Sequence, residues 1–146
     1  MSKVLIASDH AGFPGKNIIK KTLDQMGIEY EDLGTNSEES VDYPDFAERV
    51  ARRVAAGEAE RGILVCGSGI GVSIAANKIH GIRAALAWNE ETARLSREHN
   101  DANILAVGGR TTPPETIEQI TRTFLTTDFA GGRHIPRIEK ISKLEK

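Results

Sequence analysis

Residues 62–77 have the sequence GILVCGSGIGVSIAAN, and this stretch decides which kind of fold the chain can adopt. Its first four residues predict a short buried strand, and the residues after the glycines predict a helix. Between the two, Gly67, Gly69 and Gly71 let the backbone bend tightly and come close to a ligand. A helix that begins here would direct free N–H groups toward an anion. We therefore expect a strand, a glycine-rich turn and a helix, with the chain's single cysteine, Cys66, where the strand ends.

The same alternation of strand and helix extends in both directions along the chain. Apolar runs predict three more strands, at residues 4–7, 82–87 and 104–107, and a poorly alternating segment predicts another at residues 28–33. Segments with apolar residues at helical spacing predict helices at about residues 14–26, 44–56, 72–79, 90–99 and 115–126. Short strands that alternate with helices favour a parallel sheet covered on both faces. We expect an α/β fold, a single doubly wound domain (1–146) of the Rossmann or flavodoxin kind, with five parallel strands in the order 2-1-3-4-5.

This strand order places a topological switch point between the first and third strands, where ligands bind in such folds. Asp9 and His10 follow the first strand, and Cys66 and Gly67 end the third. The two polar groups should therefore face each other across one crevice.

The C-terminal tail, about residues 128–146, predicts an extra helix that ends near Leu144. Its apolar residues recur at every third position, as Ile135, Ile138, Ile141 and Leu144. A sheet already covered by five helices has little room for a sixth. We therefore expect the tail to pack on a second subunit, the alternative being that it packs on its own domain.

Composition excludes several classes of function. The chain has 146 residues, enough for one domain with a real core, and a net charge of −2, which gives no basic field for nucleic acid. No apolar run is long enough to span a membrane, and the N-terminus leads into a strand pattern without a signal peptide. One cysteine cannot form an internal disulfide, and no Cys/His group has zinc spacing. We expect a cytoplasmic protein whose cysteine is reduced and which has no zinc site.

The glycine turn does not match the common nucleotide or phosphate motifs. Val72 stands where a dinucleotide fingerprint needs glycine and where a cysteine phosphatase needs arginine, and residues 77–79 lack the Gly-Lys-Ser/Thr end of a P-loop. What remains is a thiol beside an anion-binding turn. A thiolate at this place could act as a base or nucleophile, while the N–H groups of residues 67–71 stabilise an oxyanion. This pair suits proton abstraction next to a carbonyl, with Ser68 relaying a proton, whereas a buried structural cysteine is the alternative.

Other polar residues are ambiguous when taken singly. His99 and Asn100 could belong to a site, or could end a helix with Asn100 in a left-handed conformation. Asp9 and His10 could simply form a turn, and Tyr43 could simply begin a helix. The remaining candidates, which could be solvated surface charges or phosphate contacts, are Arg110, Arg133 and Arg137. Arg133 and Arg137 are four residues apart, so they could share a helix face and clamp a phosphate.

Taken together, these segments resemble the type-B ribose-5-phosphate isomerases, a family that includes the galactose-6-phosphate isomerase subunits. The resemblance spans nearly the whole chain, in the family's order. The residues that carry it are Ser8–Gly12, Asp42–Pro44, Cys66–Gly71, Ser73–Lys78, His99–Asp101, Gly108–Arg110, Gly131–His134 and Arg137. Some members place a glutamate base in the glycine loop, where this chain has Ile70, so the chain resembles the cysteine type.

The resemblance implies a cofactor-free aldose–ketose isomerase that acts on a sugar phosphate through a cis-enediolate. It implies Cys66 as the base between C1 and C2, Ser68 as its partner for hydroxyl protons, and His99 as the acid that opens the sugar ring. It also implies an enediolate cradle from Gly67, Ser68, Gly69, Ile70 and Gly71 with Asn100, sugar contacts from Asp9, His10 and Tyr43, and phosphate contacts from Arg110, Arg133 and Arg137.

The resemblance further implies a homodimer, or a higher oligomer, whose active sites take groups from both subunits. Ribose 5-phosphate is the first choice of substrate. Allose 6-phosphate and erythrulose 4-phosphate stay open, as does a non-catalytic sugar-phosphate-binding protein. A nicotinamide-dependent enzyme is disfavoured by Val72.

Overall fold

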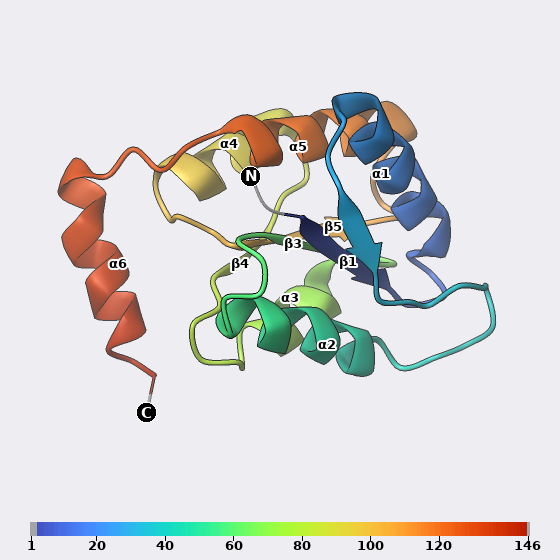
Figure 1. Cartoon of the computed structure of the whole chain (residues 1–146), viewed down its shortest axis with the longest axis horizontal. Helices are drawn as coiled ribbons and strands as arrows, with labels where there is room; N and C mark the ends of the chain where they lie inside the picture. Colours follow the sequence, from blue (N-terminus) through green and yellow to red (C-terminus); the bar gives the residue numbers. More distant parts are fainter. Residues whose placement is uncertain (1–2, 146) are drawn as a thin grey trace.

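A five-stranded parallel sheet forms the centre of the computed structural model, which describes residues 3–145 (Figure 1). The strands are β1 (Val4–Ser8), β2 (Tyr30–Asp32), β3 (Gly62–Cys66), β4 (Ala84–Leu86) and β5 (Ile104–Gly108). The helices are α1 (Phe13–Met26), α2 (Tyr43–Ala55), α3 (Ile70–Ala76), α4 (Glu90–Glu98), α5 (Pro114–Thr126) and α6 (Ile135–Ser142), with a 3₁₀ turn, η1 (Gly132–His134), before α6. The expected α/β architecture with an extra C-terminal helix is confirmed.

Helices cover both faces of the sheet because the inner strands are apolar on both sides. Along β1, Val4 and Ile6 pack toward α1, α4 and α5, whereas Leu5 and Ala7 pack toward α2 and α3. All four side chains are buried, as a doubly covered parallel strand requires. Figure 1 shows the two helical layers above and below the sheet.

The strand order is β2-β1-β3-β5-β4, so the expected order 2-1-3-4-5 is wrong at one edge. The chain passes from β3 to the edge strand β4 and then returns to place β5 between them. Burial explains why β5 is the inner strand and β4 the edge strand: all five residues of β5 are buried, whereas the three residues of β4 are only half-buried. The switch point between β1 and β3 is unaffected, and these two strands are neighbours.

Local signals placed most element boundaries correctly. Gly27 ends α1 in the left-handed conformation, at φ +69°, and the Asn89 side chain caps α4 by accepting the Thr92 N–H at 2.8 Å. Three elements are shorter than expected, since β2 is Tyr30–Asp32, β4 is Ala84–Leu86 and α3 ends at Ala76. The reason at α3 is Asn77, whose side chain bonds both the N–H and the C=O of Ala84 and so turns the chain toward β4.

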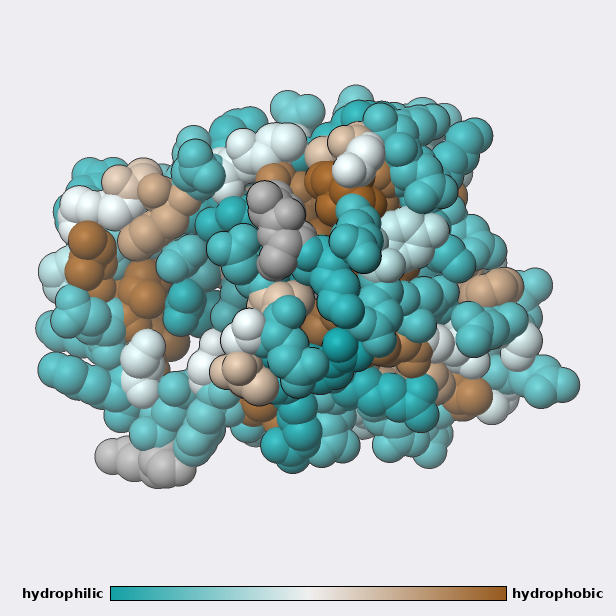
Figure 2. All heavy atoms as spheres, viewed as in Figure 1, coloured by the Kyte–Doolittle hydropathy of each residue, from teal (hydrophilic) through white to brown (hydrophobic). Residues whose placement is uncertain are grey.

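The C-terminal helix α6 stands apart from the two layers (Figure 1). None of its eight residues is buried within the single chain, and Leu144 just beyond it is 76% exposed. Hydrophobic side chains gather over this helix at the left of Figure 2. The apolar stripe expected from the sequence is therefore present and mostly uncovered in one chain.

Candidate active site

Cys66 is the last residue of β3 and lies at the start of the glycine turn. Its side chain is buried, and its Sγ accepts a hydrogen bond from the Gly69 N–H at 3.2 Å. Gly69 has φ +79°, and a Cβ there would lie 2.9 Å from the Gly108 nitrogen, so only glycine fits. Ser68 and Ile70 are exposed beside the thiol. The turn thus holds a sulfur that accepts a backbone N–H, at the carboxyl end of the central strand.

Asp9 and His10 lie beside this turn, at the end of the neighbouring strand β1. The Asp9 N–H donates to the carbonyl of Val65 at 3.2 Å, which places it against the end of β3. The Asp9 carboxylate accepts the Gly12 N–H at 2.8 Å, so it also stabilises its own turn. His10 accepts the Val41 N–H on Nδ1 at 3.1 Å. A nitrogen that accepts a backbone N–H carries no proton, so in neutral His10 the proton is on Nε2.

Tyr43 and Arg110 complete this group from two other elements. Tyr43, the first residue of α2, lies so close to Gly71 that a Cβ on Gly71 would be 2.5 Å from the tyrosine ring. The Arg110 N–H donates to the carbonyl of Gly67 at 3.0 Å, and the Arg110 side chain is exposed. We call this group the carboxyl-edge cluster: Asp9, His10, Tyr43, Cys66, Gly67, Ser68, Gly69, Ile70, Gly71 and Arg110.

The other predicted site residues form a second group, where α4 ends and α6 begins. The imidazole rings of His99 and His134 are stacked, with centroids 4.3 Å apart and planes inclined by 19°. Burial lowers the pKa of His134 below its usual range, and the nearby His99, Arg133 and Arg137 lower it further. We call His99, Asn100, Arg133, His134 and Arg137 the helix-end cluster.

Two arginines hold the turn that carries His99 and Asn100. Arg83 Nε donates to the carbonyl of Asn100 at 2.9 Å, and Arg97 Nη1 donates to the Asp101 carboxylate at 2.9 Å. The left-handed residue of this turn is Asp101, at φ +47°, so the expectation that Asn100 takes that conformation is wrong. The Asp101 carboxylate stabilises the turn through Arg97, which lies four residues before it.

The two clusters lie at opposite ends of the parallel strands, one at the carboxyl end and the other at the amino end. Cys66 pairs with Gly108 at the carboxyl end of β3 and β5, whereas the Gly62 N–H bonds the carbonyl of Asn103 at the other end. Cys66 lies four residues after Gly62 along β3, a rise of about 13 Å. His99 and Asn100 precede Asn103, so they belong to the far edge. One chain therefore does not bring Cys66 and His99 together.

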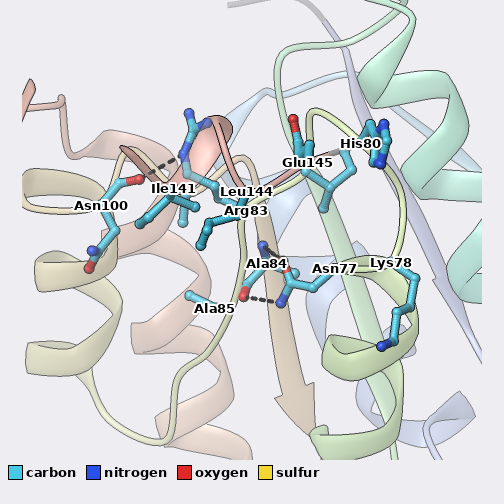
Figure 3. A pocket seen from close by; sticks show the side chains of 12 residues that line it. Asn77, Lys78, His80, Arg83, Ala84, Ala85, Asn100, Ile141, Leu144 and Glu145 are labelled. Carbon is cyan, nitrogen blue, oxygen red and sulfur yellow. Dashed lines mark hydrogen bonds between the residues drawn. The ribbon is translucent and has the colours of Figure 1, made fainter. Parts of the chain in front are cut away.

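A cavity of about 570 Å³ opens beside the helix-end cluster, between α6 and the start of β4 (Figure 3). Asn100 and Arg83 line it on one side, and Ile141 and Leu144 on the other. Glu145 closes one end by accepting the Gly81 N–H at 2.6 Å. Among the described residues, none from the carboxyl-edge cluster lines this cavity, so it is not the place of the thiol chemistry.

Comparisons with known proteins identify the family. A model described as Ribose/Galactose Isomerase matches residues 4–141. The chain belongs to this isomerase family. A putative sugar phosphate isomerase of Bacillus subtilis is 53% identical to it over 99% of the chain and 97% of that protein.

Solved structures agree with this family assignment. Ribose-5-phosphate isomerase B of Clostridium thermocellum matches with a TM-score of 0.96 and 51% identity, over 98% of this chain and 97% of that one. The Mycoplasma genitalium enzyme, solved with bound ribulose 5-phosphate, matches with a TM-score of 0.94 and 43% identity, over 98% and 95%. The chain is therefore an enzyme of the isomerase class.

The sequence analysis assigned no individual role to four residues that hold the surroundings of the two clusters in place: Lys16, Arg83, Arg97 and His134. One signal was available for Lys16 and Arg97, since both are cations on the buried face of an amphipathic helix. Lys16 shares the face of Ile19 and Leu23 in α1. A cation at such a position predicts a buried ion pair: the partner of Arg97, Asp101, lies four residues on, whereas the partner of Lys16, Asp32, cannot be read from local spacing.

Across residues 3–145, no three His, Cys, Asp or Glu side chains converge as a metal-binding group. Within the same residues, no helix has the length and apolar character needed to cross a bilayer.

Proposed function

We propose that this isomerase interconverts ribose 5-phosphate and ribulose 5-phosphate, without a metal or other cofactor. The proposal rests on the Cys66 sulfur, which lies at the start of the glycine turn and 3.2 Å from the Gly69 nitrogen. The bound ribulose 5-phosphate of the Mycoplasma genitalium enzyme supports the choice of a five-carbon substrate.

The chemistry moves one proton between two carbons. The Cys66 thiolate removes the proton from C2 of the open-chain aldose, and the electron pair forms the C1–C2 double bond of a cis-enediolate. Backbone N–H groups of residues 67–71 stabilise the oxygen on which negative charge develops. Ser68 relays a proton between O2 and O1, and the Cys66 thiol returns its proton to C1, which gives the ketose.

Substrate enters this reaction after its ring has opened. His99 protonates the ring oxygen as its bond to C1 breaks, and the C1 hydroxyl loses its proton to water, which gives the open-chain aldehyde. Asn100 helps to hold the enediolate. Asp9, His10 and Tyr43 bind the sugar hydroxyls, while Arg110, Arg133 and Arg137 bind the phosphate through charge-assisted hydrogen bonds.

We further propose that the active enzyme is a homodimer with two shared sites. Each site combines the carboxyl-edge cluster of one subunit with the helix-end cluster of the other. Support comes from the separation of the clusters by about 13 Å of strand within one chain. The uncovered apolar stripe of α6 supports the tail as part of the subunit contact. The single, unpaired cysteine fits a reducing cytoplasm, where we place the reaction in the pentose phosphate pathway.

The decisive experiment is a coupled isomerase assay with four-, five- and six-carbon sugar phosphates, run with and without a chelator. We expect the highest kcat/KM with ribose 5-phosphate and no effect of the chelator. Cys66→Ala should lower kcat by a factor of about 10² to 10⁴, as expected for the loss of a general base, with an unchanged circular dichroism spectrum.

Each other outcome has a definite meaning. Preference for a six- or four-carbon substrate would replace ribose 5-phosphate in the proposal. Full activity of Cys66→Ala would remove Cys66 as the base. Binding of ribose 5-phosphate without exchange of its C2 proton into heavy water would indicate a binding protein.

A further inference from the structure

Lys16 is a lysine with no exposed surface, although it belongs to a helix at the outside of the domain. Its Nζ donates to the Asp32 carboxylate at 2.7 Å and also to the carbonyl of Thr35. The same Nζ lies 5.6 Å from the centre of the Phe13 ring. The ammonium is therefore enclosed and bonded to two groups from the end of β2 and the loop after it.

Burying this charge has a cost that the pairing offsets only in part. Burial lowers the pKa of Lys16, while its hydrogen bond to Asp32 and the negative charge there act in the opposite direction. Burial would raise the pKa of Asp32, but hydrogen bonds from Lys16, the Gly34 N–H and Lys20 outweigh it and keep that pKa below its usual range. A buried ion pair adds little stability over apolar residues of the same size. Stability alone does not account for a lysine at this position, so we looked at what it holds in place.

Lys16 holds one end of the loop that joins β2 to α2. Gly34 and Thr35 bond the end of β1 on one side, through the Ser8 N–H to the Gly34 carbonyl and the Thr35 N–H to the Ser8 carbonyl, both at 2.8 Å. On the other side, Lys16 bonds the Thr35 carbonyl. The start of the loop is thereby clamped between β1 and α1.

The far end of this loop reaches the carboxyl-edge cluster. Residues 36–40 are mostly exposed, and the only hydrogen bond that the structure describes within them joins the Glu39 N–H to Ser37 Oγ. The loop then returns so that the Val41 N–H meets His10 Nδ1 at 3.1 Å. A loop with so few contacts of its own depends on its anchors, and Lys16 is the buried side chain among them.

We propose that Lys16 is a positioning residue for His10. By bonding the Thr35 carbonyl, Lys16 keeps the loop where the Val41 N–H bonds His10 Nδ1, so that Nε2 carries the proton and donates to a hydroxyl of the substrate. The inference rests on the proposed function in that it takes His10 as a substrate contact. Its structural half, the coupling of Lys16 to the His10 tautomer, concerns the free enzyme alone.

The test compares Lys16→Met with a matched control, Lys20→Met, in the full-length enzyme. Lys20 bonds the other oxygen of the same Asp32 carboxylate at 3.1 Å and makes no described contact with the loop. In Lys16→Met the carboxylate still has Lys20 and the Gly34 N–H, so it does not become an unpaired buried charge. Each variant therefore removes one ammonium from Asp32, but only Lys16→Met also removes the hydrogen bond to the Thr35 carbonyl.

Two readouts follow the two halves of the proposal. Long-range ¹H–¹⁵N NMR of the ligand-free enzyme at neutral pH reports which ring nitrogen of His10 is protonated. We expect a single Nε2–H tautomer in the wild type and in Lys20→Met, and a mixture in Lys16→Met. With ribose 5-phosphate, KM should rise about tenfold in Lys16→Met, with a smaller change in kcat, because one hydrogen bond to the substrate is lost.

An unchanged His10 tautomer in folded Lys16→Met would overturn the inference. A mixed tautomer with an unchanged KM would overturn the role in substrate binding. If Lys16→Met does not fold, Val41→Pro removes the N–H that bonds His10 Nδ1 and leaves Lys16 in place. An unchanged His10 tautomer in Val41→Pro would also overturn the inference. If the wild type does not isomerise ribose 5-phosphate, the proposed function fails, while the tautomer measurement still decides the coupling.

Discussion

Two stacked imidazoles connect the end of α4 to the segment that carries Arg133 and Arg137. The stacking of His99 on His134 is a contact between residues 35 positions apart, and it sets the plane of the proposed ring-opening acid. A lowered pKa keeps His134 neutral at neutral pH, so it offers His99 a flat surface without a second charge. The ring of His134 therefore matters to His99 through its shape.

A ring at position 134 should be sufficient for this role. We expect His134→Phe to retain most of the wild-type kcat/KM for ribose 5-phosphate, and His134→Ala to lose about fivefold, since an aromatic stack is worth about 1 kcal/mol. The loss should be larger with the ring-closed sugar than with an open-chain analogue in a steady-state assay. Equal losses in the two variants would argue that the stack does not position His99.

Single residues also mark the limit of prediction from sequence. Cys66, Ser68 and the glycines could be placed because strand, turn and helix signals surround them at short range. The partners of Lys16 and Arg83 could not, because Thr35 lies 19 positions from Lys16 and Asp101 lies 18 positions from Arg83. Such contacts depend on how elements pack, which a local pattern does not contain.

Among the elements, β2 is short and relies on side chains to attach it to its surroundings. The Glu31 carboxylate accepts hydrogen bonds from Arg53 of α2 at 2.8 and 3.1 Å and from Lys3 at 2.7 Å. The bond to Arg53 and then the bond to Lys3 lower the pKa of Glu31 to about 2. The strand is thus tied electrostatically to α2 and to the start of β1.

This attachment predicts a pH-dependent effect of Glu31→Gln. The folded chain keeps Glu31 ionised at pH values where the unfolded chain binds a proton, so the stabilisation is complete above about pH 4.5 and is lost as the pH falls toward about 2. In chemical denaturation experiments, the difference in unfolding free energy between wild type and Glu31→Gln should shrink over that range. Glu29→Gln is the control, since no described hydrogen bond involves the Glu29 side chain. A difference that stays constant down to about pH 2.5 would contradict the prediction.

Element order illustrates which part of the fold the sequence could not determine. The alternation of strands and helices was sufficient for the fold class, because every strand except the short, polar β2 is an apolar run bounded by glycine, proline or polar residues. The order of β4 and β5 was not, because both are apolar runs of similar local character. Their places depend on which strand can be covered on both faces, and the fully buried β5 takes the inner one.

At the scale of the whole molecule, the separation of the two clusters makes a prediction about assembly. In a twofold dimer with shared sites, a subunit with Cys66→Ala and a subunit with His99→Ala form a hybrid in which one site carries both changes and the other carries neither. Mixing the two inactive variants under conditions of subunit exchange should therefore restore activity in about a quarter of all sites.

The control for this experiment mixes Cys66→Ala with Cys66→Ser, where no arrangement yields an intact site. Activity should be measured against the fraction of hybrid found by native mass spectrometry. Activity that does not increase with the hybrid fraction would mean that each site is built from one chain, and the assignment of His99 would then fail.

The position of β5 has a consequence for how the chain is made. During synthesis, residues 84–86 leave the ribosome before residues 104–108, yet β4 pairs with β5 and with no other described strand. Until β5 emerges, β4 has no partner and β3 presents an open edge of unpaired N–H and C=O groups, the kind of edge that other chains can bind. The last strand to be synthesised is also the one inserted between two earlier ones. A nascent chain that stops before residue 104 therefore has an incomplete sheet. The strand left open to pairing with other chains is β3, which ends at Cys66.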